Sequence, residues 1–372
     1  MLIGLPKEIK NHEYRVGLTP ASVRELVKHG HEVLVEKNAG TAIGLDDADY
    51  QKAGAKIAAG AQEVFDRAQM IVKVKEPQPQ ECKMLKADQI LFTYLHLAPD
   101  PQQAELLMQS GAIAIAYETV EDARGRLPLL APMSEVAGRM SIQAGAHYLE
   151  KSHGGRGVLL GGVPGVPAAD VVILGGGVVG SNAARVAVGM GAHVTIIEKS
   201  SERLRQLDDM FGPSARTIYA TDHAIEHYVL EADLVIGAVL VAGAAAPRLV
   251  TRQHISQMKK GAVLVDVSID QGGCFETSKA TTHADPVYVV DGVVHYCVAN
   301  MPGAVARTST FALNNATLPY VLSLADKGYK QALLEDPGFR KGLNVSKGRI
   351  THLQVAEALN KDYRPAEDAL AA

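Results

Sequence analysis

The sequence predicts an α/β protein with two Rossmann-like domains, each with a mainly parallel sheet, the first domain discontinuous. Short apolar runs alternate with stretches of helical periodicity along most of the chain, as in parallel sheets covered by helices. A glycine-rich turn stands between a strand and a helix at 175–180. The last stretch, from about Arg307, is helical and too short for a third domain, so we expect it to return to the first domain.

The first domain is predicted to comprise residues 1–128 plus 307–372, and to bind the substrate. Its strand-like apolar runs occur at 2–5, 31–36, 70–74, 90–94 and 112–117. Its helical patterns occur between a cap at Thr19 or Ser22 and Gly30, and at 61–67, 101–111, 309–327 and 354–360.

The second domain is predicted to span 129–306 and to bind the nucleotide. It opens with a helix that Ser134 caps and that runs to about Lys151, before a glycine-rich loop or hairpin at 153–167. Its apolar strand runs lie at 171–174, 193–197, 232–241, 262–267 and 287–290. Its other helical patterns run from Asn182 to Gly191 and over 251–258.

The turn at 175–180 has the spacing Gly175-x-Gly177-x-x-Gly180, and Glu198 follows the next strand. In a strand–turn–helix unit the first glycine permits a tight turn, the second lets a pyrophosphate approach, and the third lets helix and strand pack. Glu198 can accept hydrogen bonds from ribose hydroxyls and would repel a 2′-phosphate, so the pattern favours NAD over NADP. The alternative, a βαβ unit whose glycines serve only the turn, ranks lower.

Four ionisable residues stand where predicted strands end: Arg15, Lys75, His96 and Asp270. Because ligands of open α/β sheets bind at the carboxyl ends of strands, two cations and a histidine there would form an anion site beside a general acid or base. Asp270 lies on a glycine-rich turn that would face the nicotinamide side of a Rossmann crevice. Taken singly, each has an ordinary explanation as a surface cation, a structural histidine or an Asx turn.

The composition is that of a globular enzyme, with 47% hydrophobic residues, 21% charged residues and a net charge of -4. This charge gives no indication of a nucleic-acid partner. Charged residues near the N-terminus and the lack of an apolar run of roughly 18 residues predict a cytoplasmic protein with no membrane partner. Cys82, Cys274 and Cys297 form no paired framework and are expected to be free. No residue is assigned to a metal.

Several segments together resemble the alanine dehydrogenase and pyridine nucleotide transhydrogenase family. In the N-terminal part they are GLPKEIK at 4–10, EYRVGLTP at 13–20 and VKEP at 74–77. Further along they are MSEVAGR at 133–139, the glycine turn, and VDVSIDQGG at 265–273. The likeness covers essentially the whole chain. Within the family, the chain resembles the alanine dehydrogenase branch in its length and in its lack of predicted membrane segments.

The resemblance implies oxidative deamination of L-alanine with NAD⁺ to pyruvate and ammonium, and the reverse reductive amination, by a homohexamer. It implies Arg15 and Lys75 as substrate-binding residues, and His96 and Asp270 as the catalytic pair. The family usually has Asp where this chain has Glu198, a change that keeps the carboxylate. The residues expected around NAD, including those of the glycine turn, are Ser134, Gly175, Gly177, Val178, Val179, Gly180, Glu198, Arg203, Val239, Leu240, Val267, Ser268, Ile269, Asp270, Val298, Ala299, Asn300 and Met301.

Three alternatives stay open at the level of the sequence. One is a soluble dehydrogenase of the same family for another amino acid, such as a saccharopine-forming enzyme. Another is a transhydrogenase subunit, which would need a membrane partner. The third is a non-catalytic NAD(H)-responsive binding protein, against which the joint presence of Lys75, His96 and Asp270 argues.

Overall fold

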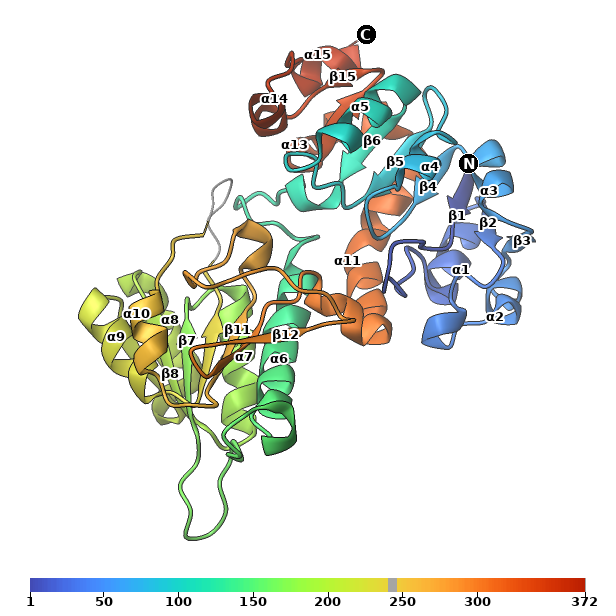
Figure 1. The fold of residues 1–372 in the computed structure, drawn as a ribbon. Coiled ribbons are helices and arrows are strands. Elements are labelled where there is room, and N and C mark those ends of the chain that lie inside the picture. The colour runs from blue at the N-terminus through green and yellow to red at the C-terminus, as the bar shows by residue number, and fades with distance from the viewer. Residues whose placement is uncertain (240–245, 372) are drawn as a thin grey trace. The chain divides into compact units, whose positions relative to one another are not determined.

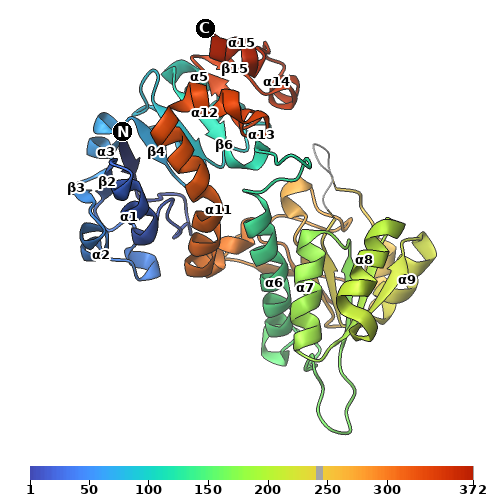
Figure 2. The same ribbon diagram turned by 180° about the vertical axis from the view of Figure 1, so that it is seen from behind.

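The structure is a computed structural model of the 372-residue chain and describes residues 1–239 and 246–371. The described residues form two compact units, each with its own sheet (Figures 1 and 2). The first unit consists of Met1–Met133 and Ala306–Ala372, and the second of Ser134–Val305. The predicted fold class, two mainly parallel α/β sheets with a discontinuous first domain, is confirmed.

The first unit is built on an eight-stranded sheet with the order β15-β14-β6-β5-β4-β1-β2-β3, in which β1 to β6 are parallel, β14 runs antiparallel to β6, and β15 runs antiparallel to β14. The strands are β1 (Leu2–Leu5), β2 (Glu32–Glu36), β3 (Lys56–Ala58), β4 (Met70–Val72), β5 (Ile90–Thr93), β6 (Ile113–Ala116), β14 (Leu343–Ser346) and β15 (Arg349–Ile350). The helices are α1 (Pro20–Lys28), α2 (Asp47–Lys52), α3 (Ala61–Arg67), α4 (Pro79–Cys82), α5 (Pro101–Ser110), α11 (Ala306–Lys327), α12 (Tyr329–Glu335), α13 (Pro337–Arg340), α14 (Leu353–Leu359) and α15 (Ala366–Ala371), with short 3₁₀ turns η1 (Thr41–Ile43) and η2 (Tyr117–Thr119).

The second unit has a seven-stranded sheet with the order β12-β13-β11-β10-β7-β8-β9, in which only β12 among the described strands runs antiparallel. The strands are β7 (Asp170–Leu174), β8 (His193–Glu198), β9 (Ala215–Tyr219), β10 (Leu234–Gly237), β11 (Val263–Asp266), β12 (Val287–Val290) and β13 (Val293–Tyr296). The helices are α6 (Ala131–Tyr148), which begins in the first unit, α7 (Val178–Gly189), α8 (Ser201–Phe211), α9 (Asp222–Glu231) and α10 (Arg252–Gln257), with 3₁₀ turns η3 (Lys151–His153), η4 (Gly212–Ser214), η5 (Ile269–Gln271) and η6 (Met301–Val305).

Local sequence explains where these elements lie. The central strands β5 and β6 are fully buried and apolar except for Thr93 at the end of β5, as parallel strands covered on both faces require. Helix α1 begins where the Thr19 hydroxyl accepts a hydrogen bond from the Ser22 N–H at 3.2 Å, with Pro20 at its first position. Helix α5 ends at Gly111, whose φ of 69° suits glycine.

Two predicted helix starts are wrong. Helix α6 begins at Ala131, whose N–H donates to the Leu127 carbonyl oxygen at 3.0 Å, so Ser134 lies inside the helix rather than at its N-cap. Helix α7 begins at Val178, because the glycine turn itself supplies its first residues, and not at Asn182. The elements that were not predicted are β3, β9, β13, β14, β15, α2, α4, α8, α9, α12, α13 and α15.

Both sheets contain a point where the chain order reverses, between β1 and β4 in the first unit and between β7 and β10 in the second. In open α/β sheets the carboxyl ends of the strands at such a point form the binding crevice. The search for a site therefore begins at the loops that follow these strands.

Within the described part of the chain, no helix combines the length and the apolar character that crossing a bilayer would require.

Candidate active site

The glycine turn follows β7 at the reversal point of the second sheet. Gly175 has a φ of 96°, which favours glycine, and a Cβ on Gly180 would overlap the Gly175 carbonyl oxygen. A Cβ on Gly177, in contrast, would meet no other part of the protein within 4 Å. Packing within the protein therefore requires glycine at 175 and 180, whereas the turn leaves open space beside Gly177.

The N-terminus of α7 opens onto this space. Val178, the first residue of the helix, is exposed, and the backbone N–H groups of the first turn have no partners within the helix. These groups and the positive end of the helix dipole form the kind of site that binds a phosphate. Helix α6 packs on the same turn at Gly138, where a Cβ would overlap the Val179 carbonyl oxygen. The residues present thus fit the pyrophosphate of a dinucleotide.

Glu198 and Arg203 hold the turn from the ends of β8 and α8. Glu198 accepts hydrogen bonds from the N–H groups of Gly176 at 2.8 Å and Ser200 at 2.9 Å. Arg203 donates from Nε to the Gly176 carbonyl oxygen at 2.7 Å. Because a carboxylate has about four acceptor positions, Glu198 keeps capacity for ribose hydroxyls beyond these two bonds. Both residues therefore support the turn in addition to their predicted contacts with NAD.

The carboxyl ends of β10, β11 and β13 lie at the same edge of the parallel sheet as the glycine turn. The Val267 N–H donates to the Gly237 carbonyl oxygen at 2.9 Å, and Ser268 Oγ donates to the Val239 carbonyl oxygen at 2.7 Å. These two hydrogen bonds join the segments after β10 and β11, which were both predicted to line the NAD site. The predicted segment 298–301 follows β13 at the same edge. Leu240 lies outside the described residues.

Asp270 lies in η5, just after β11, and is exposed. The turn that carries it is held by Asp266, whose carboxylate accepts hydrogen bonds from the N–H groups of Ser268 at 3.0 Å and Cys274 at 2.9 Å, and from the Ser278 hydroxyl. Burial raises the pKa of Asp266, although these hydrogen bonds oppose the shift. Asp266 is a positioning residue that was not predicted from the sequence. The one sequence feature that could have indicated it is a carboxylate at the last position of an apolar strand.

Arg15 lies in the loop after β1 and is buried, with 2% exposure. Its Nε and Nη2 donate to the Glu13 carboxylate at 2.7 and 2.6 Å, and its Nη1 lies 3.1 Å from Sδ of Met133. Burial alone would lower the pKa of Arg15, but the hydrogen bonds and charge of Glu13 outweigh it and raise the pKa. Glu13 therefore fixes the orientation of the guanidinium through its Nε–Nη2 edge.

The segment after β4 places two lysines in different surroundings. The Lys73 ammonium is fully buried, 3.1 Å from Glu8 and 2.7 Å from Glu81. Burial alone would lower the pKa of Lys73, but the two carboxylates outweigh it and raise the pKa to about 12. Lys75 is only partly buried, and its N–H and that of Val74 donate to Glu8 at 3.3 and 2.6 Å. The buried Glu8 therefore fixes the backbone from which Lys75 extends.

His96 follows β5 with a φ of 49°, a conformation that is uncommon for a residue other than glycine. Its N–H donates to Oε1 of Glu118 at 2.6 Å, and its Nδ1 lies 3.9 Å from the same oxygen. The ring stacks on Tyr94 with 5.8 Å between centroids, and 43% of the side chain is exposed. A sparsely populated backbone conformation that presents an exposed imidazole is typical of a functional position.

The structure brings three of the four predicted residues to one edge of the first sheet. Strands β1, β4 and β5 are parallel neighbours, so the segments that carry Arg15, Lys75 and His96 leave the sheet on the same side. Tyr94 connects two of them, because it stacks on His96 and its phenol interacts with the charge of Arg15. Asp270 belongs to the second unit, so a single cleft that contains all four residues stays a prediction.

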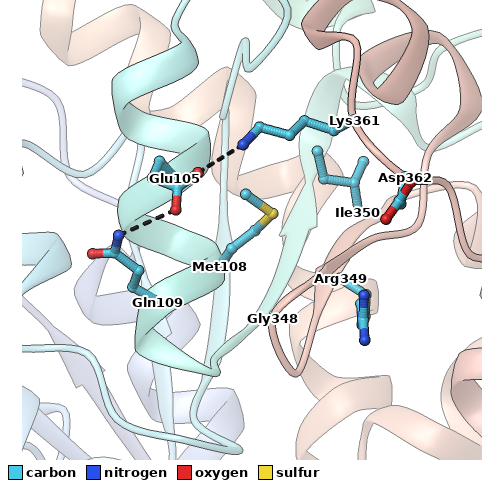
Figure 3. A pocket seen from close by; sticks show the side chains of 8 residues that line it. All are labelled: Glu105, Met108, Gln109, Gly348, Arg349, Ile350, Lys361 and Asp362. Atoms are coloured by element: carbon cyan, nitrogen blue, oxygen red, sulfur yellow. Dashed lines mark hydrogen bonds and ion pairs between the residues drawn. The ribbon is translucent and has the colours of Figure 1, made fainter.

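A groove of about 340 Å³ lies elsewhere in the first unit, beside α5 (Figure 3). Figure 3 shows Lys361 reaching from the C-terminal segment to Glu105, with which it pairs at 3.0 Å. None of the described residues predicted to bind substrate or NAD lines this groove. The lining residues are Glu105, Met108, Gln109, Gly348, Arg349, Ile350, Lys361 and Asp362.

Sequence comparison gives two family matches. Residues 4–137 match the profile described as "Alanine dehydrogenase/PNT, N-terminal domain", and residues 141–353 match "Alanine dehydrogenase/PNT, C-terminal domain". The chain is 60% identical to an alanine dehydrogenase of Halomonas elongata over 98% of both chains. It is 57% identical to an alanine dehydrogenase of Methanococcus maripaludis over 100% of both.

Solved structures give the same picture. A structure described as an L-alanine dehydrogenase superposes with a TM-score of 0.94 at 54% identity, covering 97% of this chain and 99% of the other. A transhydrogenase from Sinorhizobium meliloti superposes with a TM-score of 0.81 at 23% identity, covering 95% of this chain and 99% of the other. At that identity the second likeness shows the fold alone.

Proposed function

The chain belongs to the alanine dehydrogenase and pyridine nucleotide transhydrogenase family, and on that basis we propose that it catalyses the NAD-dependent oxidative deamination of L-alanine and its reversal. The observation that carries the proposal is the full-length identity of 56–60% to proteins described as alanine dehydrogenases. In the proposed reaction, L-alanine, NAD⁺ and water give pyruvate, ammonium, NADH and a proton.

The second unit would hold NAD and the first unit the substrate. The open space at Gly177, the N–H groups at the start of α7 that have no partner within the helix and the remaining acceptor capacity of Glu198 support nucleotide binding. When bound, NAD⁺ accepts the hydride that leaves Cα of the amino acid. Glu198 would favour NAD over NADP, because a carboxylate at this place repels a 2′-phosphate.

Arg15 and Lys75 would bind and orient the substrate. The guanidinium of Arg15 would pair with the amino-acid carboxylate, which fixes the direction of the Cα–H bond. Lys75 would stabilise negative charge that develops on the substrate oxygen when water adds to the iminium carbon. Glu13 and Glu8 support this arrangement, since one holds the guanidinium and the other the backbone at Lys75.

His96 would carry the proton transfers. A water molecule that adds to the iminium carbon must lose a proton, and the resulting carbinolamine must regain one at nitrogen before ammonia leaves. An imidazole can accept the first proton and return it for the second step. The exposure of the His96 ring and its position at the strand edge support this role. Asp270 would balance the positive charge of the iminium or orient the water.

Assembly and location are proposed on the resemblance to the family. The chain would form a homohexamer and act in the cytoplasm. The alternatives of another amino-acid substrate, a transhydrogenase subunit or a non-catalytic NAD(H)-binding protein are not favoured by relatives of 56–60% identity.

The proposal is tested by NADH absorbance when the purified chain is mixed with NAD⁺ and a panel of L-amino acids. L-Alanine should give rapid NADH formation, with little from L-lysine or L-glutamate, and pyruvate plus ammonium should consume NADH. Nucleotide binding without any alanine-dependent reduction of NAD⁺ would instead favour the non-catalytic alternative. Faster turnover of a long side chain than of alanine would favour a different dehydrogenase.

A further inference from the structure

The end of α6 carries a cluster of potential metal ligands far along the chain from the predicted active-site residues. His147 is in the last turn of α6, Glu150 follows the helix, and His153 closes η3. All three are exposed, and one ligand atom of each lies within 4.8 Å of those of the other two. Among the described residues this is the one group of three or more His, Cys, Asp and Glu side chains that meets this condition.

The distances match those between ligands of one metal ion. Nδ1 of His147 lies 3.7 Å from Oε1 of Glu150, and Nδ1 of His153 lies 3.3 Å from Oε2. Two ligands at the usual bond lengths of a tetrahedral zinc ion are separated by about 3.4 Å. The two imidazole rings lie 3.9 Å apart between centroids with a tilt of 41°, and both Nδ1 atoms lie near the carboxylate of Glu150.

The backbone fixes this convergence. On a straight helix His147 and His153 would lie about 9 Å apart along the axis. Instead α6 stops at Tyr148, and the Gly155 N–H donates to the Glu150 carbonyl oxygen at 3.1 Å, which turns the chain back. A Cβ on Gly155 would overlap the Tyr148 carbonyl oxygen, so the turn packs directly on the helix end. The third ligand is thus brought back by a close-packed turn.

The electrostatics also suit a cation. The negative end of the α6 dipole lies at this cluster and favours positive charge. Two imidazoles this close to each other repel when both are protonated, whereas two neutral imidazoles and one carboxylate form a common ligand set for Zn²⁺. The other polar contact of the group is between Ser152 Oγ and Nδ1 of His153, at 3.3 Å, and a metal ion would replace it.

We propose that His147, Glu150 and His153 form a binding site for a divalent transition-metal ion, with Zn²⁺ as the representative. The three side chains supply nitrogen, oxygen and nitrogen ligands, and water completes the coordination. The ion would tie the end of α6 to η3, where the chain leaves for the glycine-rich loop of the second unit (Figure 1). This inference does not depend on the proposed dehydrogenase activity.

The test is calorimetric titration of zinc chloride into the full-length, tag-free chain after treatment with a chelator. We expect one high-affinity zinc ion per chain. His147→Ala and His153→Ala should each weaken that binding about tenfold or more, and Glu150→Gln should weaken it as well. Zinc should also raise the thermal unfolding midpoint of the unsubstituted chain but not that of His153→Ala, because a ligand that binds only the folded state stabilises it.

Two substitutions in the same unit serve as matched controls. His193 forms an exposed pair with Asp170 at 3.6 Å, so His193→Ala removes a comparable surface imidazole and should leave zinc binding unchanged. His223 and His227 lie four residues apart on α9 with 6.4 Å between ring centroids, which makes them the rival histidine pair. The proposal is overturned if the chain binds no zinc, or if His227→Ala abolishes binding while the α6 variants retain it.

Discussion

Replacement of Gly177 by alanine should separate nucleotide binding from folding. A Cβ at this position would meet no other part of the protein within 4 Å, and the φ of -67° is allowed for alanine. If the pyrophosphate lies against the N-terminus of α7, the methyl group would displace one of its hydrogen bonds to the turn. A bond to a charged group contributes roughly 1.5–3 kcal/mol, so the dissociation constant of NADH should rise about tenfold to a hundredfold.

Two other glycines of the same helix provide the controls. Gly189, the last residue of α7, also has open space at its Cβ, so Gly189→Ala should leave NADH binding unchanged and stabilise the chain by up to about 1 kcal/mol. Gly180→Ala would force a methyl group into the Gly175 carbonyl oxygen and should lower the unfolding midpoint. NADH binding is measured by fluorescence titration and stability by thermal unfolding.

The outcome of this comparison is decisive for the nucleotide site. If Gly177→Ala binds NADH as tightly as the unsubstituted chain, the pyrophosphate does not approach this turn and the assignment of the second unit fails. If Gly177→Ala unfolds as readily as Gly180→Ala, the glycine is required by the protein's own packing and not by a ligand.

Further substitutions test the first unit. His96→Ala should lower kcat about 10²–10⁴-fold while the dissociation constant of NADH changes little; near-normal turnover would remove His96 from the mechanism. Glu8→Gln should lower the free energy of unfolding in urea by about 1–3 kcal/mol, because Lys73 keeps only Glu81 as a buried counter-charge, and an unchanged midpoint would contradict this. Glu76→Gln tests acid stability. Burial alone would raise the pKa of Glu76, but Lys75 and the ion pair with Lys10 outweigh it and lower the pKa from 4.5 to about 2. The stabilisation from Glu76 is therefore present above pH 4.5 and lost as the pH falls towards 2, so the variant should lose less stability than the parent over that range in acid-unfolding curves.

The fold class could be predicted because buried parallel strands are continuous apolar runs. Two of the strands that were missed, β9 and β14, depart from this pattern for identifiable reasons. Strand β9 lies at the sheet edge and carries the exposed Arg216, so it shows no apolar run. Strand β14 contains the buried Asn344, whose side-chain amide donates to Thr119 Oγ1 at 2.8 Å and to the Gly342 carbonyl oxygen at 2.9 Å. A buried polar residue that bonds to a partner 225 residues away cannot be recognised as part of a core strand from local sequence.

The residues of the candidate site could be predicted only in part from the sequence, for a similar reason. The pattern of strand ends singled out Arg15, Lys75 and His96, because the end of a strand is a local feature. Glu13, which holds Arg15, is a near neighbour in sequence, but the other supporting groups are distant: Glu118 is 22 residues from His96, and Glu8 is 67 residues from Lys75. The proposed metal ligands at the end of α6 could not be recognised from the sequence either, because they form a cluster only where the helix stops.

These supporting groups also constrain what the first unit can bind. Each predicted cation has a carboxylate beside it, since Arg15 pairs with Glu13 and Lys75 with Glu76. The nearby Lys10 also pairs with Glu76, and Lys73 pairs with Glu8 and Glu81. A dicarboxylate would gain one guanidinium contact but place its second charge in surroundings with no excess of positive charge. A zwitterion with a single carboxylate and a small apolar side chain suits these surroundings better. If Arg15 and Lys75 bind the substrate as proposed, we therefore expect their ion pairs to disfavour glutamate relative to alanine.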